Sequence, residues 1–558
     1  MNLFTKCKLL MMAAFCAQVV ACAKHDVQPD SGSPEITLST GEYKVKVGKT
    51  ATLAISVKDA VAPVISWKLD GKIISTDSLC PFVGSEVGEY FVTVRVDAQN
   101  GSAEQQVKVT VVDKLPPQIT LPTNMVAFMG RDNYLAATVA NADSATYIWR
   151  FNGAIVGHDS VYVLNPVAQG TNSLALEVSN NDGADKQSIT LIVLPPPPAG
   201  LFFDDGHYRL PGDVSTKRMS VPLGKSLVLA PVTANIPSPI TFQWTVNGTP
   251  QSSTSQYLTF TPATPGTSLI TVSAGGLTAK VNVECVAAEG TYFRTPGAGS
   301  VNMVTTAFEF IPAPGQFTDY QDGSSADQAR QDIQSSLDQR ISGTFIALLG
   351  ACGGYFITGF DHSVSDVSGK ADLRINGNQF PLWSEPGIVW VMQDENGNGL
   401  PDDTWYELKG SETGKSETHE RYAITYYKPS APGMDVVWID NFGGTGSVDY
   451  NQYHSQPYYF PMFINADSYT LTGTCLKSTM AIGALETSAG YPWGYVDNVG
   501  DGSKVDFWIE DAIKADGSPA NLKYIDFVKV QTGMTGKGPS VGEISTESCA
   551  PIDLNLKN

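Results

Sequence analysis

The sequence predicts an all-β protein: three small tandem β-sandwiches followed by a larger jelly-roll-type β-sandwich with one short helix. Three observations predict this fold. A tryptophan-centred pattern occurs three times, alternating apolar and polar residues follow each copy, and a long C-terminal part is rich in short apolar runs. With 558 residues the chain is too long for one ordinary domain. Its 52 glycines and 34 prolines fit a chain rich in turns.

Charge limits the classes of partner. The chain has 36 basic and 56 acidic residues, which gives a net charge of −20. Such an acidic surface repels phosphate groups, so nucleic acid and anionic lipid are excluded as main partners. Hydrophobic residues make up 42% of the chain, which is enough to build folded cores and excludes wholesale disorder.

The N-terminus has the composition of an export signal. Two lysines precede an apolar run over residues 9–20, which is shorter than the roughly 20 residues of a membrane-spanning helix. The run ends in small residues and Cys22, which match the bacterial lipobox, where the cysteine is acylated. We expect residues 1–21 to be a lipoprotein signal peptide and residues 22–34 a flexible stalk. The protein would then be lipid-anchored at the outer membrane and exposed at the cell surface. The alternative is a plain signal peptide with a chance cysteine at the cleavage point.

The repeated pattern is centred on Trp67, Trp149 and Trp244. Each tryptophan is followed by an apolar residue two positions later and by Asp-Gly or Asn-Gly at positions three and four. The Asp-Gly or Asn-Gly pair supplies the positive φ of a tight hairpin, and the tryptophan fills the space between two sheets. These repeats resemble PKD-like and other immunoglobulin-like sandwiches. The predicted domains are residues 35–113, 116–194 and 199–288, joined by proline-rich linkers that make them spacers.

The remaining residues 289–558 lack the repeat and form the predicted ligand-binding domain. Strand-like segments are frequent there, and one stretch predicts a helix. Residues 324–327 can cap that helix, because Ala329, Ile333 and Leu337 then share one apolar stripe.

A calcium loop is predicted between two strand-like runs. Oxygen-bearing side chains at loop positions 1, 3, 5 and 9, with glycine at 6, reproduce the first part of an EF-hand-like loop. The predicted ligands are Asp394, Asn396, Asn398, the Leu400 carbonyl and Asp402. Position 12 is a tryptophan instead of a bidentate glutamate, so another carboxylate, Asp403 or Glu407, must complete the shell. The alternative is a long hairpin turn without metal.

Enzyme signatures are missing from the sequence, so no enzymatic activity is predicted. There is no G-x-S-x-G elbow, H-E-x-x-H motif or P-loop. A glycosidase needs only two opposed carboxylates, which sequence cannot pair, and that option stays open. Five cysteines follow Cys22 without a C-x-x-C spacing, so buried free thiols or one bridge among the last three are expected.

Aromatic residues surrounded by turn-forming and amide residues are the clearest indication of a ligand site. Flat rings beside amides and carboxylates suit a large, partly apolar ligand that also forms hydrogen bonds. The predicted ligand-binding residues are Trp438, Asn441, Tyr458, Tyr459, Trp493, Tyr495, Asp497 and Asn498. The alternative is that part of these aromatics packs the ends of the sandwich.

Residues 353–362, 384–408, 456–459 and 525–532 also carry a family resemblance. They resemble the C-terminal domain of Bacteroidetes cell-surface lipoproteins that have PKD-like repeats in front of it, over roughly residues 291–552. Some proteins of this kind are associated with cobalamin uptake across the outer membrane. The resemblance therefore implies a surface lipoprotein that captures a corrinoid and hands it to an outer-membrane uptake receptor. A glycan-binding or glycan-hydrolysing surface protein is the alternative, and a structural adhesin is a third.

Overall fold

The computed structural model describes residues 33–121, 124–195, 197–318, 324–339, 345–451, 453–454, 456–482, 486–498, 505–538 and 540–556. The expected signal peptide and its Cys22 lie outside the described residues. In the described part of the chain no helix is both long and apolar enough to cross a membrane. The chain forms two compact units: the first holds the described residues up to Ile119 with Val139–Thr146 and Glu177–Asp185, and the second holds the rest.

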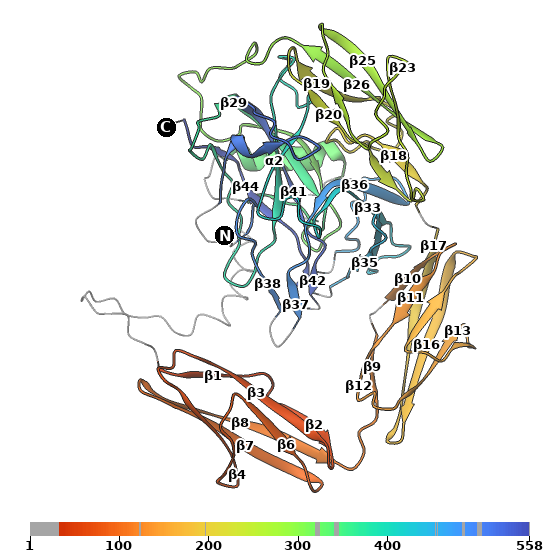
Figure 1. Ribbon diagram of the computed structural model, residues 1–558, viewed down its shortest axis with the longest axis vertical. Helices are drawn as coiled ribbons and strands as arrows, with labels where there is room; N and C mark the ends of the chain where they lie inside the picture. Colours follow the sequence, from red (N-terminus) through yellow and green to blue (C-terminus); the bar gives the residue numbers. More distant parts are fainter. Residues whose placement is uncertain are drawn as a thin grey trace. The chain divides into compact units, whose positions relative to one another are not determined.

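The first repeat consists of two antiparallel-rich sheets around one core (Figure 1). Its five-stranded sheet has the order β2 (Glu42–Lys46), β8 (Gly101–Val112), β7 (Gly88–Ala98), β4 (Val64–Leu69) and β5 (Lys72–Ser75). Its second sheet has the order β1 (Glu35–Leu38), β3 (Thr50–Lys58) and β6 (Leu79–Val83).

The second repeat has the same arrangement. Its main sheet runs β10 (Asn124–Phe128), β17 (Gly183–Leu194), β16 (Gly170–Asn180), β13 (Thr146–Phe151) and β14 (Ala154–Gly157). The smaller pairs are β11 (Asn133–Ala136) with β15 (Val161–Leu164), and β9 (Gln118–Thr120) with β12 (Thr138–Ala140).

The third repeat again has a five-stranded sheet. The order is β19 (Lys217–Pro222), β26 (Leu277–Val286), β25 (Gly266–Ala274), β22 (Gln243–Val246) and β23 (Thr249–Pro250). Beside it, β18 (Gly200–Phe202) pairs with β21 (Val232–Ala234), and β20 (Leu227–Leu229) pairs with β24 (Leu258–Phe260). In all three repeats the first strand of the five-stranded sheet pairs in parallel with the last strand of the repeat.

The tryptophans Trp67, Trp149 and Trp244 lie in the cores of the three repeats, as the sequence predicts. None is more than 1% exposed. Each indole Nε1 donates to a backbone carbonyl ten or eleven residues later, at 2.8, 2.9 and 2.8 Å respectively. The glycine that ends each turn has a φ between +77° and +86°, which confirms the predicted hairpins.

The C-terminal domain is built around a six-stranded sheet. Its order is β27 (Thr306–Ile311), β29 (Tyr355–Ser365), β41 (Tyr524–Thr532), β31 (Gly387–Met392), β32 (Tyr406–Leu408) and β40 (Ala512–Ile513). A four-stranded sheet has the order β35 (Thr445–Val448), β34 (Val436–Asp440), β33 (His419–Tyr427) and β36 (Ser468–Cys475). A three-stranded sheet has the order β39 (Asp506–Phe507), β30 (Leu373–Arg374) and β45 (Ile552–Asp553). Three pairs complete it: β28 (Phe345–Leu348) with β44 (Glu547–Cys549), β37 (Met480–Ile482) with β38 (Glu486–Ser488), and β42 (Lys537–Gly538) with β43 (Gly542–Glu543).

The six-stranded sheet is covered on both faces, so all nine residues of β41 are buried. On one face Phe356 and Val528 pack in a core with the helix α2 (Ala326–Asp338). On the other face Ile357 packs in a core with residues of the four-stranded sheet. A 3₁₀ turn, η2 (Ile509–Asp511), precedes β40.

The helix α2 confirms its sequence prediction (Figure 1). The Ser325 hydroxyl caps it by accepting the Gln328 N–H at 3.1 Å. Ala329, Ile333 and Leu337 are its buried residues. The predicted all-β fold class with one short helix is thus confirmed.

Candidate functional site

Trp438 forms one wall of a cavity of about 280 Å³ in the C-terminal domain. It lies on β34 directly opposite Gly446 on β35. A Cβ on Gly446 would stand 2.4 Å from indole Cζ2, so the glycine is what lets the indole lie across the neighbouring strand. We call this recess the Trp438 cavity; Tyr426, Met534, Lys537 and Glu543 also line it.

Glu543 is a buried carboxyl at the wall of the Trp438 cavity. Its side chain is 3% exposed, and Oε1 accepts the backbone N–H of Gln316 at 2.7 Å. Oε2 has no hydrogen-bond partner among the described residues. Burial raises the pKa of Glu543 to about 8. At neutral pH this carboxyl is therefore mostly protonated, and Oε2 can donate as well as accept a hydrogen bond.

Lys537 lines the same cavity, and its charge is already balanced. Its ammonium donates to Ser447 Oγ at 2.8 Å and to Asp449 Oδ1 at 2.6 Å. The cavity thus presents an aromatic wall, a neutral carboxyl and an ion pair at one side. Such a lining suits a neutral ligand that combines apolar surface with hydrogen-bonding groups.

The structure does not gather the eight predicted ligand-binding residues at one surface. Tyr459 is 1% exposed, and its hydroxyl accepts the Asn451 N–H at 3.0 Å. Tyr495 is 2% exposed, and its hydroxyl accepts the Glu412 N–H at 3.0 Å. Both tyrosines are therefore buried residues whose hydroxyl groups hold loop backbone in place.

Asp497 and Asn498 are also buried and hold backbone in place. The Asp497 carboxylate accepts the backbone N–H groups of Asn378 and Glu547, each at 2.9 Å. Burial raises the pKa of Asp497 well above its usual range. The negative charge of the neighbouring Glu547 acts in the same direction. The Asn498 side chain exchanges two hydrogen bonds of 2.7 Å with the backbone of one residue, Tyr491.

Asn441 faces the third repeat instead of the Trp438 cavity. Its amide donates to the Thr233 carbonyl at 3.1 Å and to the Arg421 carbonyl at 2.9 Å. Tyr458 and Trp493 stay partly exposed on loops of their own. Of the eight residues, Trp438 alone is among those that line this cavity.

In the predicted calcium loop, the side chains form hydrogen bonds with the loop backbone and with one another. Asp394 accepts the Gly397 and Gly399 N–H groups at 2.8 and 3.0 Å. The side-chain amides of Asn396 and Asn398 both donate to Asp402 Oδ1, at 2.9 and 3.1 Å. Loop positions 3, 5 and 9 therefore meet at one point.

Two further facts bear on calcium. Asp403 Oδ1 accepts from the Asn396 amide at 3.1 Å, so Asp403 is the carboxylate beside the loop's side chains, whereas Glu407 is held by Thr474. The described part of the chain contains no group of three or more His, Cys, Asp or Glu side chains placed to hold a metal ion. The loop offers two carboxylates, two amides and a carbonyl, and calcium binding stays a prediction.

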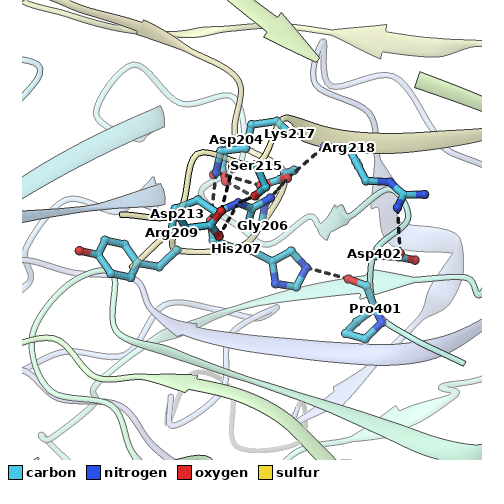
Figure 2. A network of polar contacts seen from close by, with 12 residues as sticks. Asp204, Gly206, His207, Arg209, Asp213, Ser215, Lys217, Arg218, Pro401 and Asp402 are labelled. Atoms are coloured by element: carbon cyan, nitrogen blue, oxygen red, sulfur yellow. Dashed lines mark hydrogen bonds and ion pairs between the residues drawn. The ribbon is translucent and has the colours of Figure 1, made fainter. Parts of the chain in front are cut away.

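The third repeat packs directly against the C-terminal domain, so it is not the detached spacer that the sequence analysis expects. Strand β19 lies along the loop after Asp394: Ser220 and Thr404 exchange two hydrogen bonds, of 3.1 and 2.6 Å. The Ser220 hydroxyl also donates to Glu395. Arg218 approaches Asp402 at 3.8 Å, as Figure 2 shows.

A segment following β18 reaches into the C-terminal domain. The His207 ring bonds the Pro401 carbonyl at 2.7 Å (Figure 2) and Glu309 Oε2 at 2.5 Å. Burial by itself lowers the pKa of His207, but the Glu309 carboxylate outweighs burial and raises it. From β41, Lys529 donates to the Gly206 carbonyl at 2.8 Å.

Sequence reasoning missed this junction, although one signal was present. Lys529 stands between two valines in a strand that the structure buries on both faces. A lysine buried to 3% exposure needs anionic partners, and burial lowers its pKa while Asp204 and Glu309 oppose that shift. Those partners lie on segments far away in the sequence, so no local sequence pattern predicts them.

The five cysteines in the described residues, Cys80, Cys285, Cys352, Cys475 and Cys549, are all buried free thiols. This agrees with the first of the two cysteine expectations. Cys352 and Cys475 are neighbours inside the C-terminal domain, and their contact, together with burial, raises the pKa of the Cys352 thiol.

Residues 33–98 match the family of PKD-like domains. No curated protein matches the sequence. Among solved structures, the chain is similar to fibronectin(III)-like modules of CbhA from Clostridium thermocellum, with 20% identity over 29% of this chain and 95% of that one, at a TM-score of 0.17. Tandem immunoglobulin domains of titin show 17% identity over 29% and 98% of the two chains, at a TM-score of 0.15. The N-terminal immunoglobulin pair of the Drosophila receptor protein tyrosine phosphatase DLAR shows 16% identity over 29% and 100%, also at 0.15.

The family match shows a PKD-like domain over residues 33–98. The chain is therefore a protein with a PKD-like domain, and its described residues form three repeats that share a five-stranded sheet. The neighbours carry no argument about what it binds.

Proposed function

We propose that this protein is a cell-surface lipoprotein that captures a corrinoid and presents it to an outer-membrane uptake receptor. The observation that carries the proposal is the pairing of Trp438 and Glu543 in one cavity. A corrinoid is a broad ring edged with carboxamide arms. The indole offers flat contact to the ring, and the Glu543 carboxyl at the same wall adds one hydrogen-bonding group for a carboxamide arm, since Oε1 already accepts the Gln316 N–H.

The volume of the Trp438 cavity limits how much of a corrinoid can enter it. A cavity of about 280 Å³ holds one edge of a corrin ring with its amide arms and leaves the rest of the ligand outside. The exposed remainder is what a receptor would need in order to take the ligand over. Asn441, Tyr458 and Trp493, which are partly exposed, are the other predicted residues with accessible surface.

The anchor of the proposal is Cys22, which lies outside the described residues. Acylation at Cys22 would hold the acidic chain at the membrane. A form exported with a cleavable signal peptide in place of residues 1–22 should leave the membrane fraction, because it lacks both the apolar run and the acylated cysteine. If that form fractionates with membranes as the wild type does, the lipoprotein proposal fails.

Titration calorimetry on an anchor-free chain that begins at Ala23 tests the ligand. We expect cobalamin to bind with submicromolar affinity, which corresponds to more than about 8 kcal/mol. An oligosaccharide panel is titrated in parallel. Absence of heat with cobalamin and binding of an oligosaccharide would instead support a glycan-binding surface protein, the alternative function.

A further inference from the structure

A second cavity lies between the third repeat and the C-terminal domain. Its volume is about 140 Å³, and it shares no lining residue with the Trp438 cavity. We call it the junction cavity. The third repeat supplies an apolar side that includes Met219, Leu227 and Val228, and the C-terminal domain supplies Trp390, Trp405 and Glu407.

The polar side of the junction cavity is one row across the six-stranded sheet. Lys529 on β41 pairs with Trp390 on β31, and Trp390 pairs with Glu407 on β32. Directly opposed residues of antiparallel strands project from the same face, so the three side chains stand side by side. All three line the cavity. Across the three strands the row therefore presents an amine, an indole and a carboxyl, in that order.

Most charges around the junction cavity already have partners. The Lys529 ammonium donates a hydrogen bond to the Gly206 carbonyl and lies 4.1 Å from the Tyr355 ring centroid. Arg421 pairs with Glu420 at 3.3 Å. A ligand entering this space therefore meets little net charge, which favours a neutral ligand.

Glu407 is the charged lining residue that can still accept a hydrogen bond from a ligand. Thr474 Oγ1 donates to Glu407 Oε2 at 2.5 Å, and in the described part of the chain Glu407 forms no ion pair. Its side chain keeps part of its accessible surface although burial raises its pKa to about 7. Glu407 is among the residues that line the junction cavity, so its accessible part faces that recess. A ligand hydroxyl there can donate to this carboxyl.

The two indoles complete the lining. Neither Trp390 Nε1 nor Trp405 Nε1 has a hydrogen-bond partner among the described residues. Both nitrogens are buried, and Trp405 Nε1 lies against Gly206, so the indoles offer apolar contact to C–H groups. The volume is close to the ~150 Å³ cavity known to hold one benzene molecule, so one six-membered ring is the size that enters.

We propose that the junction cavity binds one pyranose ring of a neutral sugar, stacked on Trp390 and Trp405 and hydrogen-bonded to Glu407. A pyranose has the required size and lacks net charge. Its hydroxyl groups both donate and accept, and its ring C–H groups are apolar. This proposal does not rest on corrinoid binding, because the two cavities have separate linings.

Saturation-transfer difference NMR on the anchor-free chain tests the proposal with glucose, galactose, mannose and N-acetylglucosamine. We expect at least one of them to bind in the millimolar range or tighter. Glu407→Gln should weaken that binding about tenfold, because the amide oxygen that replaces the carboxylate accepts the ligand's hydrogen bond without a charge. Val228→Trp, which fills the cavity from the third repeat, should abolish it.

Trp438→Ala is the matched control, because it alters the other cavity and should leave sugar binding unchanged. Circular dichroism on each variant confirms that it is folded; should Val228→Trp be unfolded, Glu407→Gln alone decides. Absence of transfer to all four sugars, or transfer that Glu407→Gln leaves unchanged, would overturn the proposal.

Discussion

The indole of Trp405 occupies the space that a side chain at Gly206 would need. A Cβ built on Gly206 would stand 2.2 Å from Trp405 Cδ1, and Gly206 has a φ of +86°. The third repeat can therefore touch the C-terminal domain here only through bare backbone. This contact brings the Gly206 carbonyl within 2.8 Å of the Lys529 ammonium.

Gly206→Ala should destabilise the second compact unit by about 2–6 kcal/mol. The substitution combines the strain of a positive φ with overpacking against an aromatic ring, each of which costs about 1–3 kcal/mol. Chemical denaturation measures the change. Gly212→Ala is the matched control: Gly212 also has a positive φ, of +96°, but no atom lies within 4 Å of its added Cβ. Equal losses for the two variants would show that the Trp405 contact contributes nothing.

A fragment of residues 289–558 should be markedly less stable than a fragment of residues 199–558. Without the third repeat, Lys529 loses the Gly206 carbonyl and the Asp204 charge, and a buried ammonium is left without those partners. Thermal unfolding followed by circular dichroism compares the two fragments. The same melting temperature for both would restore the view of the third repeat as a spacer.

The C-terminal domain should lose stability as pH rises from about 5 to about 8.5. Burial raises the pKa of Glu543 to about 8 and that of Glu407 to about 7. Between the usual carboxyl pKa and these values the folded state binds more protons than the unfolded state, so rising pH favours unfolding. The contribution is complete below the usual pKa and is lost as pH passes 7 to 8.

Glu543→Gln provides the comparison for the pH experiment. The amide keeps the size of the side chain and does not ionise, so the slope of stability against pH should be smaller in this variant. Denaturant titrations at several pH values measure both slopes. Identical slopes would mean that Glu543 does not titrate in this range.

Calcium at millimolar concentration should raise the melting temperature of the anchor-free chain after chelator treatment, by mass action on the folded state. Asp394→Ala should remove the shift, since Asp394 is the first predicted ligand of the loop. Asp516→Ala, at an exposed turn outside the loop, should keep it. If calcium leaves the melting temperature of the wild-type chain unchanged, the loop is a hairpin turn without metal.

Features set by local pattern could be predicted from the sequence. The helix stripe of Ala329, Ile333 and Leu337 repeats at helical spacing, and the core tryptophans stand at a fixed distance from their turns. Those signals depend only on neighbours along the chain.

The ligand-binding residues could not be predicted in the same way. Tyr495 and Trp438 look alike in sequence, since both stand near Asp and Asn, yet Tyr495 is buried and Trp438 lines a cavity. Glu543 and Glu407 carry no local signal at all. Their surroundings come from segments more than fifty positions away, such as Gln316 for Glu543 and Thr474 for Glu407.

The central claim is that the Trp438 cavity captures a corrinoid, and the ratio of cobalamin dissociation constants for Trp438→Ala and the wild type tests it most directly. Calorimetry on the anchor-free chain should show submicromolar binding for the wild type and at least about tenfold weaker binding for Trp438→Ala, since a lost aromatic contact costs more than about 1.4 kcal/mol. Trp149→Ala, whose tryptophan lies in the core of the second repeat, should bind as the wild type does. Cobalamin binding that Trp438→Ala leaves unchanged, or no cobalamin binding by the wild type, would contradict the claim.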